Sequence, residues 1–97
     1  MIYVEVEGAS FMVQQEMTVT SPTGFHARPA AQLVAAAAKC KSSVSILFAG
    51  KTINAKSILH VLGGGISRGA QIVVMADGED EQAALAAVCR AIENLPE

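Results

Sequence analysis

A change of hydrophobic period near the start of the chain restricts its fold more than any other feature. Apolar and polar residues alternate over residues 13–20, which indicates a strand with one face toward a core and one toward water. One face carries Val13, Gln15, Met17 and Val19, and the other carries Gln14, Glu16, Thr18 and Thr20. After the turn residues of segment 21–24, the apolar positions recur at helical spacing from Pro29 onward, and the buried stripe of this predicted helix is Ala30, Leu33, Val34, Ala37 and Ala38. The chain therefore combines strands with helices.

The middle of the chain continues this mixture. Two strands are predicted at Ser43–Ala49 and Thr52–Asn54, joined by a turn at Gly50-Lys51. Asn54 is expected to be the N-cap of a short helix that runs to about Leu62, with Ala55, Lys56 and Ser57 in its first turn. The glycine run at residues 63–65 ends that helix.

The last part predicts one more strand and one more helix. The strand is expected at Gln71–Ala76, followed by a turn at Asp77-Gly78. The helix opens with an acidic first turn at residues 79–81, which complements its dipole, and it ends at Pro96. Its buried positions are Leu85, Val88, Cys89, Ile92 and Leu95.

The order β-α-β-β-α-β-α predicts an α+β fold, an open-faced sandwich. We expect a four-stranded antiparallel sheet with three helices on one face. A chain of 97 residues is long enough for one domain, which we assign to residues 12–97. Residues 1–11 precede it as an extension in which apolar residues also alternate. Three interpretations are open: an extra edge strand, a linker remnant of a larger protein, or a misassigned start, with Met12 as the true first residue.

Composition excludes several classes of function. The net charge of −2 argues against nucleic acid as a partner, because binding to a phosphate backbone needs a surplus of Lys and Arg. No apolar run approaches the length that spans a bilayer, so the protein is not expected to be embedded in a membrane. Cys40 and Cys89 lack metal-ligand spacing and are expected to be packed thiols, as suits a reducing cytosol. Nothing in the pattern demands more than a monomer.

The segment around His26 is the strongest candidate for a chemical role. His26 is the last loop residue before a predicted helix, and Arg28 follows in the first turn. Backbone N–H groups at a helix start lack acceptors within the helix and favour anions, a neutral imidazole is a nucleophile, and a guanidinium can bind two oxygens. The pair is suited to holding a phosphoryl group on His26, although a His-x-Arg spacing alone also fits a loop residue beside a helix start.

A second feature lies in the short middle helix. Ser57 is placed where an added phosphate would be tolerated by the helix start, although it also fits an ordinary exposed serine. Ile58 and Leu59 are consecutive, so a two-turn helix leaves one of them in an exposed apolar patch. His60 is expected at the surface, and a metal site with His26 is rejected because no Cys, Asp or Glu cluster supports it.

Taken together, these segments resemble the HPr family, the histidine-containing phosphocarriers of the bacterial phosphoenolpyruvate:sugar phosphotransferase system. The resemblance covers nearly all of residues 12–95. It rests on Val13-Gln14-Gln15-Glu16, Gly24-Phe25-His26-Ala27-Arg28-Pro29-Ala30-Ala31, Ala55-Lys56-Ser57-Ile58 and Gly78-Glu79-Asp80-Glu81-Gln82.

The resemblance implies a carrier in a relay rather than a stand-alone enzyme, with no cofactor and no metal. His26 would be phosphorylated on Nδ1 by enzyme I, which draws on phosphoenolpyruvate, and would pass the group to IIA domains of sugar permeases, with Arg28 assisting. Ser57 matches the serine that a dedicated kinase phosphorylates, and a phosphorylase would be its counterpart. The partner-binding residues would be Phe25, Ala27, Ile58 and Leu59.

Two departures and two alternatives accompany this interpretation. The glycine run at 63–65 replaces the family's Ser/Thr-Leu-Gly and predicts a looser end to the short helix, and Thr23 stands where many members have Asn. The chain is alternatively a domain of a larger fused phosphotransfer protein that serves fructose or dihydroxyacetone, or a regulatory binding domain without phosphoryl chemistry. The presence of both His26 and Arg28 argues against the second alternative.

Overall fold

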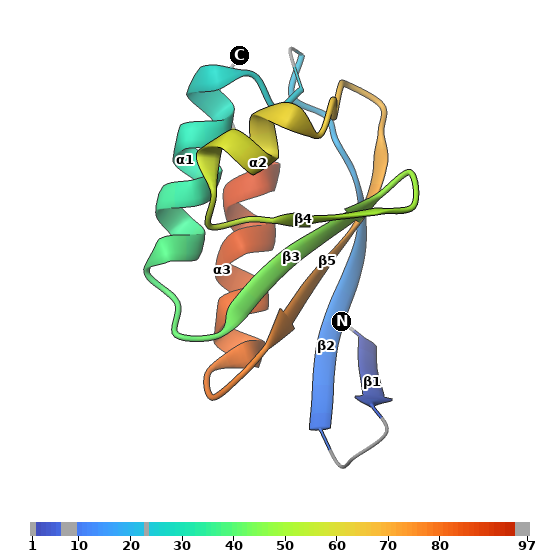
Figure 1. Ribbon diagram of the computed structural model, residues 1–97, viewed down its shortest axis with the longest axis vertical. Coiled ribbons are helices and arrows are strands. Elements are labelled where there is room, and N and C mark those ends of the chain that lie inside the picture. The colour runs from blue at the N-terminus through green and yellow to red at the C-terminus, as the bar shows by residue number, and fades with distance from the viewer. Residues whose placement is uncertain (1, 7–9, 23, 95–97) are drawn as a thin grey trace.

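An antiparallel sheet with three helices packed on one of its faces forms the fold in the described residues, 2–6, 10–22 and 24–94 of a computed structural model (Figure 1). The sheet has the strand order β1-β2-β5-β3-β4. The strands are β1 (Ile2–Val6), β2 (Ser10–Thr18), β3 (Ser43–Phe48), β4 (Lys51–Asn54) and β5 (Gln71–Asp77). The helices are α1 (Ala27–Ala38), α2 (Ile58–Gly63) and α3 (Glu81–Glu93).

The core lies between the helices and the sheet, as the predicted open-faced sandwich requires. Alternate residues of the strands are buried, among them Val13, Val44, Ile46, Ile72 and Val74. The buried stripes of the long helices meet them through Ala30, Leu33, Ala37, Ala84, Leu85, Val88 and Ile92. The α+β fold with its β-α-β-β-α-β-α order is therefore confirmed for β2 onward, because the two hydrophobic periods determined which residues face inward.

The short helix α2 begins later than the sequence predicted. Asn54 is the last residue of β4, and its Oδ1 accepts a hydrogen bond from the backbone N–H of Lys56 at 2.9 Å, which forms a turn. Ser57 is the N-cap instead, since its Oγ accepts from the backbone N–H of His60 at 3.2 Å. The prediction that Asn54 caps the helix and that Ser57 lies in its first turn was wrong.

The start of α3 also differs from the prediction. Asp80 occupies the N-cap position and Glu79 precedes it, so that Glu81 is the acidic residue in the first turn. The Asp80 carboxylate does not cap its own helix and instead accepts hydrogen bonds from the backbone N–H groups of Lys41 and Ser42, in the loop between α1 and β3. Leu95, Pro96 and Thr23, on which other expectations depended, lie outside the described residues.

Residues of the predicted extension form part of the sheet. β1 pairs with residues 10–14 of β2 and occupies the edge of the sheet opposite β4. The sheet therefore has five strands in the described residues, one more than predicted for the domain itself. The assignment of a domain boundary at residue 12 stays a prediction.

Candidate functional site

His26 occupies the N-cap position of α1. Its backbone is extended, with φ −77° and ψ −177°, and its carbonyl accepts the first helical hydrogen bond from Ala30 N–H at 2.8 Å. The His26 side chain makes no capping hydrogen bond to the helix, and the residue is exposed. The imidazole is therefore exposed to solvent, and His26 lies directly before the helix, as the sequence predicted.

The first turn of α1 supplies positive potential beside this imidazole. Ala27, Arg28 and Pro29 are the first helical residues, and backbone N–H groups at such positions have no acceptor within the helix. Pro29 has no N–H and is buried, so the two N–H groups nearest His26 belong to Ala27 and Arg28. Arg28 is exposed and adds a permanent cation to the same helix end. This arrangement favours an anionic group next to His26.

The loop before His26 is held against the loop that precedes β5. Phe25 N–H donates to the carbonyl of Ile66 at 3.1 Å, and Gly24 N–H donates to the carbonyl of Ser21 at 2.9 Å. Gly24 has φ +65°, and a Cβ atom on it would lie 2.6 Å from the Ile66 carbonyl oxygen. Only glycine fits this close approach. The contribution of Ile66 is not visible in the sequence, where Gly24 is the one signal of a constraint in this loop.

The position of Phe25 differs from the expectation that it binds partners. Its side chain is 3% exposed and belongs to the hydrophobic core. The Phe25 backbone is paired with Ile66, and the aromatic ring is turned inward at this point of the loop. Phe25 therefore positions the loop and offers almost no surface, whereas Ala27 is exposed on α1.

An apolar patch lies on α2, the helix that packs beside the N-terminal half of α1 (Figure 1). Leu59 is 80% exposed and Leu62 is 40% exposed, while Ile58 is half-buried and packs against the core. The expectation that one of Ile58 and Leu59 is exposed holds for Leu59. Leu62 was missed, although its spacing of one helical turn from Leu59 was visible in the sequence.

Ser57 and His60 lie at the start of α2, close in sequence to Leu59. Ser57 is half-buried, and its oxygen is engaged as the helix cap. His60 is exposed, as expected, and its Nδ1 accepts a hydrogen bond from the backbone N–H of Asn54 at 3.0 Å. The imidazole of His60 thus fastens α2 to the end of β4, and its function in this structure is to position α2.

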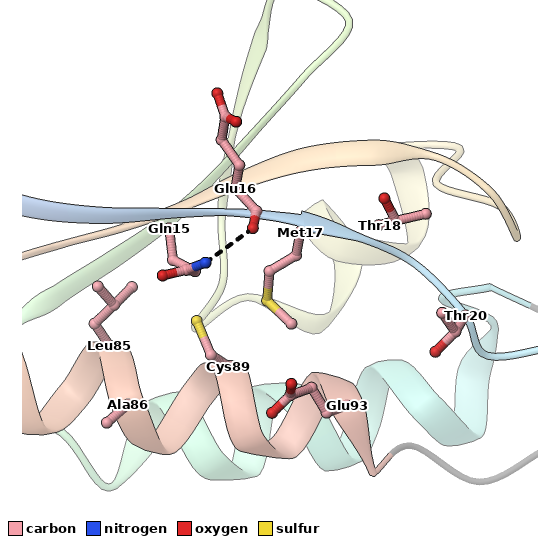
Figure 2. Close-up of a pocket in the computed structure, with 9 residues that line it drawn as sticks. All are labelled: Gln15, Glu16, Met17, Thr18, Thr20, Leu85, Ala86, Cys89 and Glu93. Atoms are coloured by element: carbon pink, nitrogen blue, oxygen red, sulfur yellow. Dashed lines mark hydrogen bonds between the residues drawn. The ribbon is translucent and has the colours of Figure 1, made fainter. Parts of the chain in front are cut away.

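A hollow of about 710 Å³ lies between β2 and α3 (Figure 2), and His26 is not among the residues that line it. Met17 from the strand and Cys89 from the helix point into it, with Glu93 at its rim. Burial raises the pKa of the Cys89 thiol to about 11, with a smaller contribution from the negative charge of Glu93. The thiol is protonated at neutral pH and is a poor nucleophile, so this hollow does not compete with His26 as a reactive site.

The two cysteines are free thiols and both are half-buried. Cys40 follows the end of α1, and burial raises the pKa of its thiol. Among the described residues, no cluster of three or more His, Cys, Asp and Glu side chains is arranged to hold a metal. No helix in the described ranges has the length and apolar character needed to cross a bilayer.

Comparisons with known proteins agree on one family. The family model described as "PTS HPr component phosphorylation site" matches residues 13–94. The phosphocarrier protein HPr of Buchnera aphidicola is 43% identical over 74 residues, which cover 76% of this chain and 87% of that protein.

Solved structures show the same similarity. HPr from Thermoanaerobacter tengcongensis matches with a TM-score of 0.81 and 36% identity, over 84% of this chain and 91% of that one. HPr from Bacillus anthracis matches with a TM-score of 0.79 and 36% identity, over 82% of this chain and 95% of that one.

Proposed function

The chain belongs to the HPr family of phosphocarrier proteins, and from this premise we propose that His26 carries a phosphoryl group between two cytoplasmic proteins. The donor in this proposal is phosphorylated enzyme I, and the acceptors are IIA domains of sugar permeases. The observation that carries the proposal is the exposed imidazole at the N-cap of α1, which makes no capping bond of its own. The protein then acts as a carrier in a relay and not as a stand-alone catalyst.

The transfer step requires a neutral imidazole nitrogen. The lone pair of His26 Nδ1 attacks the phosphorus atom, a new N–P bond forms, and the donor leaves with the electron pair of the broken bond. The negative charge of the bound phosphoryl group is stabilised by the N–H groups of Ala27 and Arg28 and by the Arg28 guanidinium. In the onward step the acceptor nucleophile attacks the same phosphorus, and the imidazole leaves with its electron pair.

The strength of this stabilisation suits a carrier. An exposed helix terminus contributes about 0.3–1 kcal/mol, and a charge-assisted hydrogen bond about 1.5–3 kcal/mol. Every further 1.4 kcal/mol that stabilised only the bound phosphoryl group would slow onward transfer about tenfold. A site with a few exposed donors holds the group and can still release it.

Partner docking is assigned to the surface around His26. Ala27, Leu59 and the exposed part of Ile58 lie on two helices that pack together, and Leu62 extends the same patch. Arg28 contributes charge beside this apolar surface.

Ser57 is proposed as a regulatory phosphorylation site next to the docking patch. Its oxygen caps α2, so a phosphoryl group there would replace the capping interaction with His60 N–H and place about two negative charges beside Leu59. Such charges repel an acidic partner and add a desolvation cost to docking. A serine kinase and a phosphorylase are the partners that this role requires.

Mass spectrometry after incubation with enzyme I and phosphoenolpyruvate tests the proposal. The chain has two histidines, and His60→Ala is therefore the matched control for His26→Ala. We expect one phosphoryl group on the wild type and on His60→Ala, lost in acid and stable in base, and none on His26→Ala. Full labelling of His26→Ala would show that another residue is the acceptor.

A further inference from the structure

β1 is an edge strand of the sheet, and with the start of β2 it extends beyond the end of β5. β1 pairs with residues 10–14 of β2, whereas β5 pairs with residues 13–18 of the same strand. Residues 10–12 of β2 consequently have β1 as their strand partner in the described residues, and this two-stranded ribbon projects at one end of the molecule (Figure 1). An isolated pair of strands has little stability in water, so a ribbon of this kind gains from a further strand.

The hydrogen-bond pattern determines which backbone groups of β1 face outward. Val19 N–H donates to the carbonyl of Ala70 at 2.9 Å, and Gly69 N–H donates to the carbonyl of Val19 at 2.8 Å. Odd-numbered residues of β2 therefore direct their backbone groups toward β5, and even-numbered residues direct theirs toward β1. In the register of Ile2 with Gln14 and Val4 with Met12, the outward backbone groups of β1 belong to Tyr3 and Glu5.

We propose that β1 pairs with the β1 strand of a second copy of this chain, antiparallel and with Val4 opposite Val4. Tyr3 of each copy then lies opposite Glu5 of the other, and each such pair exchanges both of its N–H···O bonds. The arrangement is self-complementary about a two-fold axis and closes on itself, as in most homodimers. It joins two sheets into one and differs from the monomer that the sequence pattern predicted.

The composition of β1 favours a second copy as the occupant of this edge. Its residues are Ile-Tyr-Val-Glu-Val, which are mostly β-branched or aromatic and include no Pro or Lys, the residues that usually protect an edge strand. Glu5 is the single charge. A register shifted so that Glu5 faces Glu5 is disfavoured by like charges, whereas the Val4-centred register pairs all of Ile2–Val6 and avoids that contact.

A pair of charge variants at Tyr3 tests this register. Tyr3→Lys places a cation opposite Glu5 of the other copy, and Tyr3→Glu places an anion there, while both variants remove the same tyrosine. Sedimentation equilibrium at low ionic strength is expected to show a concentration-dependent wild-type dimer. Because each contact occurs twice, the dissociation constants of the two variants should differ about tenfold or more, with Tyr3→Lys the tighter. High salt should reduce the difference.

A backbone variant supplies an independent test. Glu5→Pro removes an outward N–H and leaves the groups that face β2, whereas Glu5→Ala keeps that N–H. We expect Glu5→Pro to be monomeric and Glu5→Ala to dimerise. A wild type that is monomeric up to about millimolar concentration, or Tyr3→Lys and Tyr3→Glu variants with equal dissociation constants, would overturn the proposal. Equal constants would mean that the copies exchange an arm or associate through another face.

Discussion

His26 owes its availability to the backbone on both sides of it. On the helix side, its carbonyl starts α1 while its imidazole makes no cap. On the loop side, Phe25 N–H donates a hydrogen bond to the Ile66 carbonyl and the Phe25 ring is buried. These contacts fix the residue directly before His26. The backbone is therefore held on both sides of His26, while the His26 and Arg28 side chains are exposed.

Gly24→Ala tests whether the close approach of Gly24 to Ile66 holds the loop before His26, because the substitution adds a single Cβ atom. Gly50→Ala is the matched control, since both glycines have positive φ but a Cβ atom on Gly50 meets nothing within 4 Å. We expect each variant to lose about 1–2 kcal/mol from left-handed strain. Gly24→Ala should lose more in chemical denaturation and should also slow phosphoryl labelling, because its Cβ displaces the Ile66 loop. If the two variants are equal in stability and labelling, the close approach at Gly24 is unimportant.

Elements were predicted well where a long hydrophobic period defined them and poorly where short polar residues defined them. The existence and order of α1, α3 and the strands from β2 onward were predicted, although β2 runs from Ser10 to Thr18 and not over residues 13–20. The start of α2 does not, because Asn54 and Ser57 are both good caps and the choice between them depends on tertiary contacts. In the folded chain Asn54 closes a turn to Lys56 and its N–H is bound by His60, which leaves Ser57 as the cap.

The start of α3 makes a pH-dependent contribution to stability. Hydrogen bonds from Ser42 Oγ and from the backbone N–H groups of Lys41 and Ser42 lower the pKa of Asp80 to about 2. A carboxyl whose pKa is lower in the folded state stabilises the protein above its unfolded pKa, which is about 3.9, and this contribution is lost as the pH falls toward 2. Asp80→Asn should therefore be less stable than wild type at pH 7, and the difference should shrink between about pH 4 and pH 2.

Urea denaturation at several pH values measures this effect, with Asp77→Asn as the control that removes the same charge from an exposed position at the end of β5. Asp77→Asn should show a smaller change at pH 7. An Asp80→Asn deficit that is as large at pH 2 as at pH 7 would mean that the lowered pKa of Asp80 does not contribute.

Across the whole molecule, the family and the start of α1 could be predicted from neighbouring residues, whereas contacts between distant segments could not. His26, Arg28 and Ser57 were chosen from neighbouring residues, and the comparisons support the family to which that choice pointed. The burial of Phe25 depends on Ile66, which is distant in sequence, and no local pattern contains that contact. The pairing of β1 with β2 is local by contrast, since the two consecutive strands pair with Val6 opposite Ser10, but alternation in residues 2–6 predicts a strand and not its neighbour.

The two faces of the molecule provide the test of where partners dock. Leu59 is exposed on α2 beside the helix that carries His26, whereas Leu47 is exposed on β3, next to Ile46, which faces the core on the opposite side of the strand. Both leucines are exposed, so truncation to alanine should change the stability of each little. Leu59→Ala should raise the KM for labelling by enzyme I about tenfold, as expected for the loss of a central apolar contact, and Leu47→Ala should leave it unchanged. Equal effects of the two substitutions would place the docking surface elsewhere than on α2, and an effect of Leu47→Ala alone would place it on the open face of the sheet.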